Sequence, residues 1–214
     1  MADKSLFVGD FQKGKRQGRG TLNLSNGNTY TGIFENGSMK GQGRMVFASG
    51  NIYNGAFEDD KPHGQGKLEF VDGGNFEGEW KKGKIHGHGK WTDANGTCYE
   101  GGFQNNLYHG MGKLELPNLE VYEGFFKEGN MHGHGTYRYR DGSTYIGQFE
   151  GNKRHGLGRL EYDDGRTYDG EFRDDIMHGA GIFVDENGHK FNGKFFKGKR
   201  METKIATRQS KRIR

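Results

Sequence analysis

Aromatic residues recur along this chain at an interval of 23 residues, and the interval never changes. A glycine follows each of them two positions later, and a second aromatic residue follows four positions later. The first aromatic residues of the successive units are Phe7, Tyr30, Tyr53, Phe76, Tyr99, Tyr122, Tyr145, Tyr168 and Phe191. A fixed period of this length indicates stacked structural units, each of which repeats one supersecondary element.

The repeat that spans 145–166 shows what each unit is. Large or small apolar residues alternate with other residues in 145–149 and again in 156–162, which is the periodicity of β-strands. Polar residues separate the two strands, and Asp-Gly or Asn-Gly pairs between the repeats are typical of hairpins. The pattern therefore predicts an all-β fold, namely an elongated single-layer antiparallel sheet of about nine 23-residue hairpins, or about 17 strands.

The aromatic residues and the glycines are expected to share one face of this sheet. An aromatic ring needs room above its cross-strand neighbour, and a glycine on the neighbouring strand leaves that room. We expect the resulting ladder to replace a two-layer core. Its predicted members are Tyr30, Phe34, Tyr53, Phe57, Phe76, Trp80, Tyr99, Phe103, Tyr122, Phe126, Tyr145, Phe149, Tyr168 and Phe172.

Composition narrows the class of protein further. The 214 residues include 40 Gly and only 30% hydrophobic residues, which could also indicate disorder, but a disordered chain has no reason to keep a fixed register. The single Cys98 excludes an intramolecular disulfide and fits a reducing compartment. No apolar run approaches the roughly 18 residues of a membrane span, and 1–5 has no apolar core of a secretory signal. We expect a cytoplasmic protein.

Charge divides the chain into a repeat body and a basic end. From Lys194 onward there are nine Lys or Arg and one Glu, so this end carries +8, whereas the rest carries 23 basic and 27 acidic residues, or −4. We expect a lead-in at 1–6, the repeat array at 7–198 and a tail at 199–214. The tail is either a short helical cap on the last open strand or a basic arm for an acidic partner such as tubulin or anionic lipid. Its basic residues include Lys204, Arg208, Lys211, Arg212 and Arg214.

The segments YIGQFEGNKRHGLGRLEY and YTGIFENGSMKGQGRMVF resemble MORN repeats, the membrane occupation and recognition nexus. The shared pattern is aromatic-x-Gly-x-aromatic, a short turn, and then His-Gly-x-Gly. Eight complete copies run through 7–190, and a ninth first strand ends the array at 191–195. The resemblance implies a twisted sheet used for binding, in proteins of ciliary radial spokes, cytoskeletal scaffolds and membrane junctions.

Some positions depart from the family pattern. The His position holds Gln17 and Lys40 in the first two copies. The fifth copy has Leu119 in place of the glycine between repeats, with Pro117 two residues before it. We therefore expect the fifth of these loops to differ from the others.

Six histidines occupy one position of the repeat and invite a metal-site interpretation. They are His63, His86, His109, His132, His155 and His178. Equivalent residues of adjacent hairpins should lie about 9–10 Å apart, because two strands at about 4.8 Å separate them. Metal ligands must all lie about 2.0–2.2 Å from one ion. We therefore expect the column to be structural, and no metal or cofactor is predicted.

Two further motifs are also products of the period. Segments such as 78–84 match G-x-x-x-x-G-K, but no Ser or Thr follows and no helix is predicted to hold a phosphate, so nucleotide binding is not expected. Carboxylates such as Glu77 and Glu100 should lie on the polar, solvated face, which does not supply the desolvated site that acid–base catalysis needs. We expect no catalytic residue and no enzyme.

Apolar residues just before the His-Gly step do not belong to the repeat pattern. They are Met39, Ile85, Tyr108, Met131 and Met177, with Leu107 and Ile176 beside them. Turn tips are normally polar, so an apolar row there favours a surface that binds a partner. The alternative is that these residues pack laterally from one turn to the next.

These observations favour a non-enzymatic scaffold that docks protein partners along the sheet. The family resemblance alone suggests a ciliary axoneme, in a radial-spoke-like role, or another cytoskeletal assembly. The alternative function is a peripheral membrane module that binds anionic phospholipids or tethers membranes to the cytoskeleton, although the −4 charge of the repeat body argues against it. Nucleic acid is not an expected partner, and a homo-oligomer is left open.

Overall fold

The computed structural model describes residues 5–201, which form 18 β-strands and no helix. The first strands of the repeats have seven residues each: β1 (Leu6–Gln12), β3 (Thr29–Glu35), β5 (Ile52–Glu58), β7 (Asn75–Lys81), β9 (Cys98–Gln104), β11 (Val121–Lys127), β13 (Thr144–Glu150), β15 (Thr167–Arg173) and β17 (Lys190–Phe196). The second strands are β2 (Lys15–Asn23), β4 (Ser38–Val46), β6 (Lys61–Glu69), β8 (Lys84–Thr92), β10 (Leu107–Glu115), β12 (Asn130–Arg138), β14 (Lys153–Glu161), β16 (Ile176–Val184) and the two-residue β18 (Lys199–Arg200).

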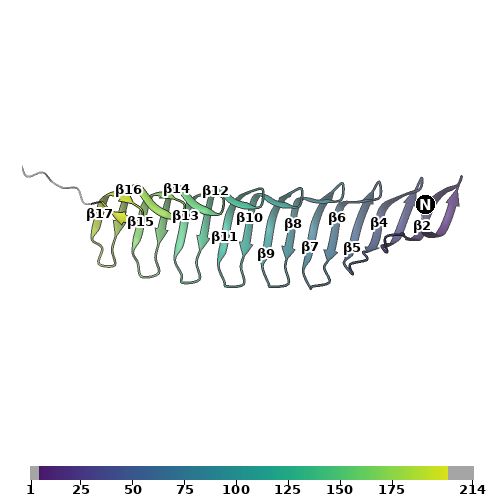
Figure 1. The fold of residues 1–214 in the computed structure, drawn as a ribbon, viewed down its shortest axis with the longest axis horizontal. Helices are drawn as coiled ribbons and strands as arrows, with labels where there is room; N and C mark the ends of the chain where they lie inside the picture. The colour runs from purple at the N-terminus through teal and green to yellow at the C-terminus, as the bar shows by residue number, and fades with distance from the viewer. Residues whose placement is uncertain (1–4, 202–214) are drawn as a thin grey trace, which may run out of the picture.

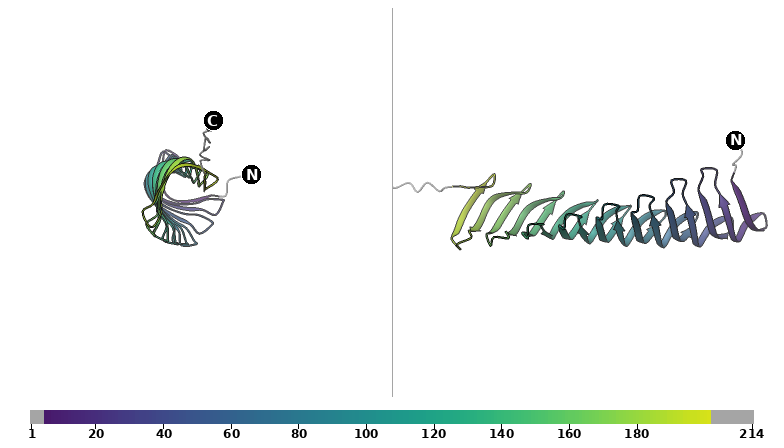
Figure 2. Two further views of the ribbon diagram at one scale, coloured as in Figure 1. Left: turned by 90° about the vertical axis from the view of Figure 1, so that its left-hand side faces the viewer. Right: turned by 90° about the horizontal axis from the view of Figure 1, so that it is seen from below.

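The strands form one open antiparallel sheet in which each strand pairs with the next along the chain. The sheet is long and narrow (Figure 1), and its cross-section is an open arc when it is viewed along its length (Figure 2). The predicted fold class is therefore confirmed. Within 5–201 no helix is long and apolar enough to cross a membrane.

A bulge in each of the eight complete hairpins bends the sheet. In the second repeat Tyr30 pairs with Met45 and Gly32 pairs with Gly43, but Phe34 then pairs with Met39. Three residues, 40–42, therefore face Ile33, and Gly41 among them takes a left-handed φ of 65°. Extra residues on one strand bend it and increase the local twist. The pairing between repeats has no such shift, so the bend recurs once per hairpin.

The two strands of a repeat are joined by two-residue turns in which both residues have positive φ, such as Asn36 (52°) and Gly37 (97°). This is the type I′ geometry that matches the twist of a hairpin. The Asn-Gly and Asp-Gly pairs between the repeats, such as Asn26-Gly27, lie instead in five-residue loops. In the first of these loops the Gly27 N–H donates to the Leu24 carbonyl, which closes a four-residue turn with glycine at its last position.

The loop of the fifth repeat has the same geometry as the others, so the expectation that it differs is wrong. The Leu119 N–H donates to the Leu116 carbonyl at 3.0 Å, and the Leu116 N–H donates to the Glu120 carbonyl at 2.9 Å. Leu119 takes a φ of 72° in place of a glycine. Pro117 fits because it occupies the second position of a turn, where its fixed φ is favourable. The surrounding sheet therefore imposes the loop conformation on an unfavourable residue.

The aromatic rings form one continuous ladder along the sheet. Tyr30 contacts Phe34 of its own strand and Phe57 of the next repeat, with ring centroids 5.2 and 4.8 Å apart and near-perpendicular planes. The same two contacts recur in the later repeats, for example at Tyr145 and Phe172. Tyr30 and Phe34 are both fully buried, although the sheet has only one layer. The rings achieve this because each lies over the glycines at the bend of its hairpin.

Candidate functional site

The apolar column beside the two-residue turns lies inside the second strands, on the aromatic face. Met39 pairs with Phe34, and Ile85 pairs with Trp80. Met39 and Ile85 are buried, at 5% and 6% exposure, whereas Tyr108, Met131 and Met177 are partly buried against the ladder. These five residues are therefore not at turn tips. Their role in partner binding stays a prediction, and the buried members present little surface to a partner.

Hydrogen bonds join each turn to the next through this same column. The second turn residue donates its N–H to the carbonyl of the column residue one repeat earlier, as from Asp60 to Met39 (3.3 Å) and from Gly129 to Tyr108 (2.9 Å). Where the turn residue is Asp or Asn, its side-chain oxygen accepts the N–H of the column residue, as Asp60 does from Met39 at 2.8 Å. The turns are thus linked laterally along the whole array.

Leu107 and Ile176 remain the accessible residues of the sequence-predicted set, at 48% and 46% exposure. Leu107 lies next to the backbone of Gly129 in the following turn, and Ile176 lies next to Gly198 in the same way. The basic tail residues lie outside the described residues.

The histidine column lies on the polar face. The Nδ1 atom of His63 is 3.2 Å from Oε2 of Glu58, and Nε2 of His155 is 3.7 Å from Oε2 of Glu150. His109 instead lies near the ring of Phe125, with centroids 6.3 Å apart. Within 5–201 no three His, Cys, Asp or Glu residues come together in a group that could hold a metal ion.

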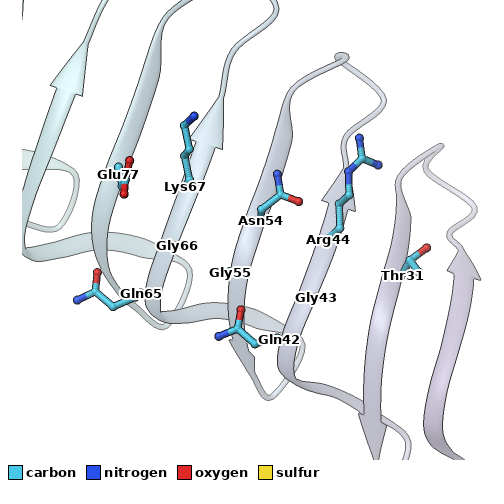
Figure 3. Close-up of a pocket in the computed structure, with 10 residues that line it drawn as sticks. All are labelled: Thr31, Gln42, Gly43, Arg44, Asn54, Gly55, Gln65, Gly66, Lys67 and Glu77. Carbon is cyan, nitrogen blue, oxygen red and sulfur yellow. The ribbon is translucent and has the colours of Figure 1, made fainter.

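A shallow groove follows the glycines on the polar face of the second to fourth repeats (Figure 3). Its volume is about 610 Å³, and its polar lining residues are Thr31, Gln42, Arg44, Asn54, Gln65, Lys67 and Glu77. From β6 to β11 basic and acidic side chains alternate from strand to strand, for example Lys90 Nζ at 3.6 Å from Glu100 Oε2. Because these groups are exposed to solvent, the groove suits weak polar contacts rather than acid–base catalysis.

An apolar cluster interrupts the polar face in the fifth to seventh repeats, and sequence inspection missed it. It consists of Met111, Phe125, Ile146 and Leu157, which are 65%, 37%, 52% and 63% exposed. We name these four residues the mid-array patch. Met111 and Phe125 are direct cross-strand partners on β10 and β11. The signal in the sequence is that these positions hold polar residues or glycine in most repeats.

The mid-array patch spans β10 to β14, or about 19 Å at 4.8 Å per strand, as two pairs of residues with His134 and Thr136 of β12 between them. Each residue lies next to a glycine or aromatic residue that faces the other side, so its side chain points to the polar face. A pocket of about 380 Å³ lies beside Met111 and is also lined by Lys113 and Glu123. Exposed apolar side chains that gather on an otherwise polar surface make this region a candidate interaction site.

A second departure from the repeat is a basic cluster at the turn between β7 and β8. Lys81, Lys82, Lys84 and His86 line a small pocket of about 300 Å³ together with Asn105 of the next turn. None of the three lysines has a carboxylate within ion-pair distance among the residues that the structure describes. The cluster can therefore attract an anion.

A family model described as MORN repeat matches residues 7–29, 30–52, 53–75, 76–98, 99–119, 122–144, 145–165 and 168–190. No curated protein matches the sequence.

Several solved structures are similar in fold. The wild-type TCP10 domain of Danio rerio CPAP has a TM-score of 0.45 and 11% identity over 83% of this chain and 84% of that chain. The TCP domain of Drosophila melanogaster SAS-4, solved with a proline-rich motif of Ana2, has a TM-score of 0.43 and 17% identity over 71% of this chain and 83% of that chain. At such scores the similarities carry no functional information.

Proposed function

Because the chain belongs to the MORN repeat family, we propose that it is a non-enzymatic scaffold that docks other proteins along its sheet. The observation that carries this proposal is the mid-array patch, where four exposed apolar side chains replace the polar residues of the repeat. Burying such a patch against a partner gains roughly 25 cal/mol for each Å² of apolar surface. The 18 strands also form a rod about 80 Å long, which suits an adaptor.

The assembly that we propose is a cytoskeletal one, with the ciliary axoneme and a radial-spoke-like role as the specific example. This part rests on the family resemblance. The exposed turn residues Leu107 and Ile176 are a second candidate contact for a protein partner, because they interrupt a row that is otherwise polar.

Proximity labelling in the native cell, followed by quantitative pull-down, tests the scaffold. Phe125→Gln with Leu157→Gln should reduce recovery of a specific set of partners at least about tenfold, since central apolar contacts dominate binding energy. Val71→Gln is the matched control, because Val71 is also exposed but lies in a loop away from the patch. A Leu107→Gln and Ile176→Gln variant tests the turn residues separately. Unchanged recovery with both double variants would contradict protein docking at these surfaces.

The second candidate function is binding to an anionic membrane surface, and the basic cluster of Lys81, Lys82 and Lys84 favours it. Each basic residue near such a surface contributes about 1 kcal/mol. Sedimentation with phosphatidylserine vesicles at physiological salt tests it with the wild-type chain, a triple Lys→Gln variant of the cluster and a chain ending at residue 201. Strong binding that the triple variant loses would favour the membrane module over the scaffold.

A further inference from the structure

Among residues 5–201, strand β1 has one edge without a strand partner. Each first strand from β3 to β17 pairs on one side with the second strand of the preceding repeat, and this interface occurs eight times. β1 is the first strand of the first repeat, and within 5–201 it pairs with β2 alone. The open edge lies at the purple end of the sheet (Figure 1).

The eight internal interfaces define what fits this edge. Between the first two repeats, Gly18 pairs with Phe34, Gly20 with Gly32, and Leu22 with Tyr30. Between the seventh and eighth, Gly156 pairs with Phe172, Gly158 with Gly170, and Leu160 with Tyr168. A strand that pairs with β1 in the same register would place these three residue types opposite Phe11, Gly9 and Phe7.

The aromatic ladder is also incomplete at this end. Phe34 is fully buried, because Phe7 of the preceding repeat packs edge-on against it at 4.9 Å. Phe11 holds the equivalent position in β1 and is 62% exposed, and Phe7 of its own strand is its ring partner. Leu6 and Val8 are 61% and 63% exposed. A preceding hairpin would supply the missing ring and cover Phe11.

The two ends of the sheet differ in how they resist pairing. Natural edge strands are usually blunted by lysine, proline or a covering segment. β17 carries Lys190 and Lys194, β18 pairs with its last two residues, and the Lys194 carbonyl accepts the Met201 N–H at 2.8 Å. β1 reads LFVGDFQ, in which Asp10 is the one charged residue. The edge of β1 is therefore the more receptive of the two.

We propose that β1 binds a terminal aromatic–glycine hairpin of a different protein chain, so that the two sheets join end to end. The last strand of this hairpin is a complete second strand of the form G-x-G-x-large apolar. The partner strand would extend the sheet in the established register, and its first-strand aromatic residue would pack on Phe11. This surface is separate from the mid-array patch, so the two proposals can fail independently.

A second copy of this chain does not meet the requirement. Two β1 strands paired about Gly9 would place Phe7 opposite Phe11, where the internal interfaces place glycine. At the other end, the sequence alignment that matches Lys199-Arg200 with Lys153-Arg154 matches Glu202 and Lys204 with Gly156 and Gly158 of the repeat. The occupant is therefore another chain that has both glycines.

The test uses a labelled synthetic peptide that copies 145–166 as the docking hairpin, added to the full chain. Fluorescence anisotropy should show binding, and hydrogen exchange of the amides in 6–12 should slow at least about tenfold while other strands stay unchanged. The control peptide carries Gly147→Val and Gly158→Val. Phe11→Glu should abolish binding, whereas Phe196→Glu at the opposite end should not, since Phe196 is exposed to a similar extent, at 52%.

If the free peptide does not fold, a fused chain tests whether β1 accepts the hairpin. A copy of 145–167 that replaces 1–6 keeps the 23-residue register and presents the hairpin directly to β1. Slower exchange of β1 in this chain, but not in one whose added copy carries the two valines, would support the proposal. Unchanged exchange of β1, equal effects of the glycine and valine hairpins, or protection located on another strand would overturn it.

Discussion

The phenolic O–H of Tyr122 donates a 3.0 Å hydrogen bond to the backbone carbonyl of Phe125, three residues along the same strand. The bond recurs wherever the first aromatic residue of a described repeat is tyrosine, for example from Tyr30 to Ile33 and from Tyr145 to Gln148. The accepting residue is the one that faces the bulge of the second strand, where the regular ladder of backbone hydrogen bonds is interrupted. The tyrosine hydroxyl therefore satisfies a carbonyl that the bend leaves without a strand partner.

Removing this hydroxyl should destabilise the fold by a small, defined amount. Tyr122→Phe should lower the free energy of unfolding by about 1 kcal/mol, because it keeps the buried ring and loses one hydrogen bond. Phe76 holds the same position in the fourth repeat without a hydroxyl, so Phe76→Tyr should raise the free energy by a similar amount. Urea titrations followed by circular dichroism measure both changes. Equal midpoints for Tyr122→Phe and the wild type would show that the bond contributes nothing.

The buried tyrosines should make the protein sensitive to alkaline pH. Burial raises the pKa of Tyr30, Tyr122 and Tyr168 to about 12, from an ordinary value of 10.0. Because the tyrosine pKa is higher in the folded state than in the unfolded state, the contribution of the buried tyrosines to stability is fully present below pH 10. It is lost as pH rises toward 12. The melting temperature should therefore fall steeply between pH 10 and 12, while absorbance at 295 nm shows delayed ionisation. In Tyr122→Phe the fall should be shallower, and a flat profile across this range would contradict the prediction.

The glycines beneath the rings should not tolerate even a methyl group. A Cβ atom on Gly135, whose φ is ordinary, would lie 2.5 Å from the Tyr122 ring. Gly135→Ala should therefore displace the ring and cost about 1–3 kcal/mol or more. Gly165→Ala is the control, since Gly165 has open space around it and an added methyl group would contact no atom. The left-handed φ of 86° would still be strained in alanine, which costs about 1 kcal/mol. If thermal melts rank the two variants in the opposite order, ring packing is not the reason for the glycine.

The left-handed Leu119 offers a route to a more stable protein. Leu119→Gly should raise the free energy of unfolding by about 0.5–1 kcal/mol. The left-handed backbone conformation costs a residue with a side chain roughly 1–2 kcal/mol, whereas glycine adopts it without strain. Gly96 occupies the equivalent position in the preceding loop with a φ of 90° and no neighbouring atom, so Gly96→Leu should lose a similar amount. Denaturant midpoints test both variants. A destabilised Leu119→Gly would indicate that its exposed side chain has stabilising contacts.

Local pattern was enough to predict the strands and the positions of the turns within repeats, but not the conformation of those turns. The 23-residue period and the alternation of residues gave the antiparallel sheet correctly. The Asn-Gly pairs predicted hairpins between repeats, yet the two-residue turns lie within repeats at pairs as different as Asp59-Asp60 and Asn105-Asn106, all with positive φ. Sequence preference alone did not identify the two-residue, positive-φ geometry of these turns, because the register of the flanking strands imposes it. The same constraint holds Leu119 in the conformation of a glycine.

The candidate sites divide in the same way. The sequence located the apolar column at the turns, but only the tertiary structure shows that Met39 and Ile85 face the ladder and are buried. It also places Met111, Phe125, Ile146 and Leu157 on one face, although they come from four strands of three different repeats. A one-dimensional period reports which positions are equivalent, whereas the bulge and the pairing register decide which face each position occupies. The repeat therefore determined the fold by itself, and the three-dimensional register determined where the molecule is open to a partner, namely on the polar face and along the free edge of β1.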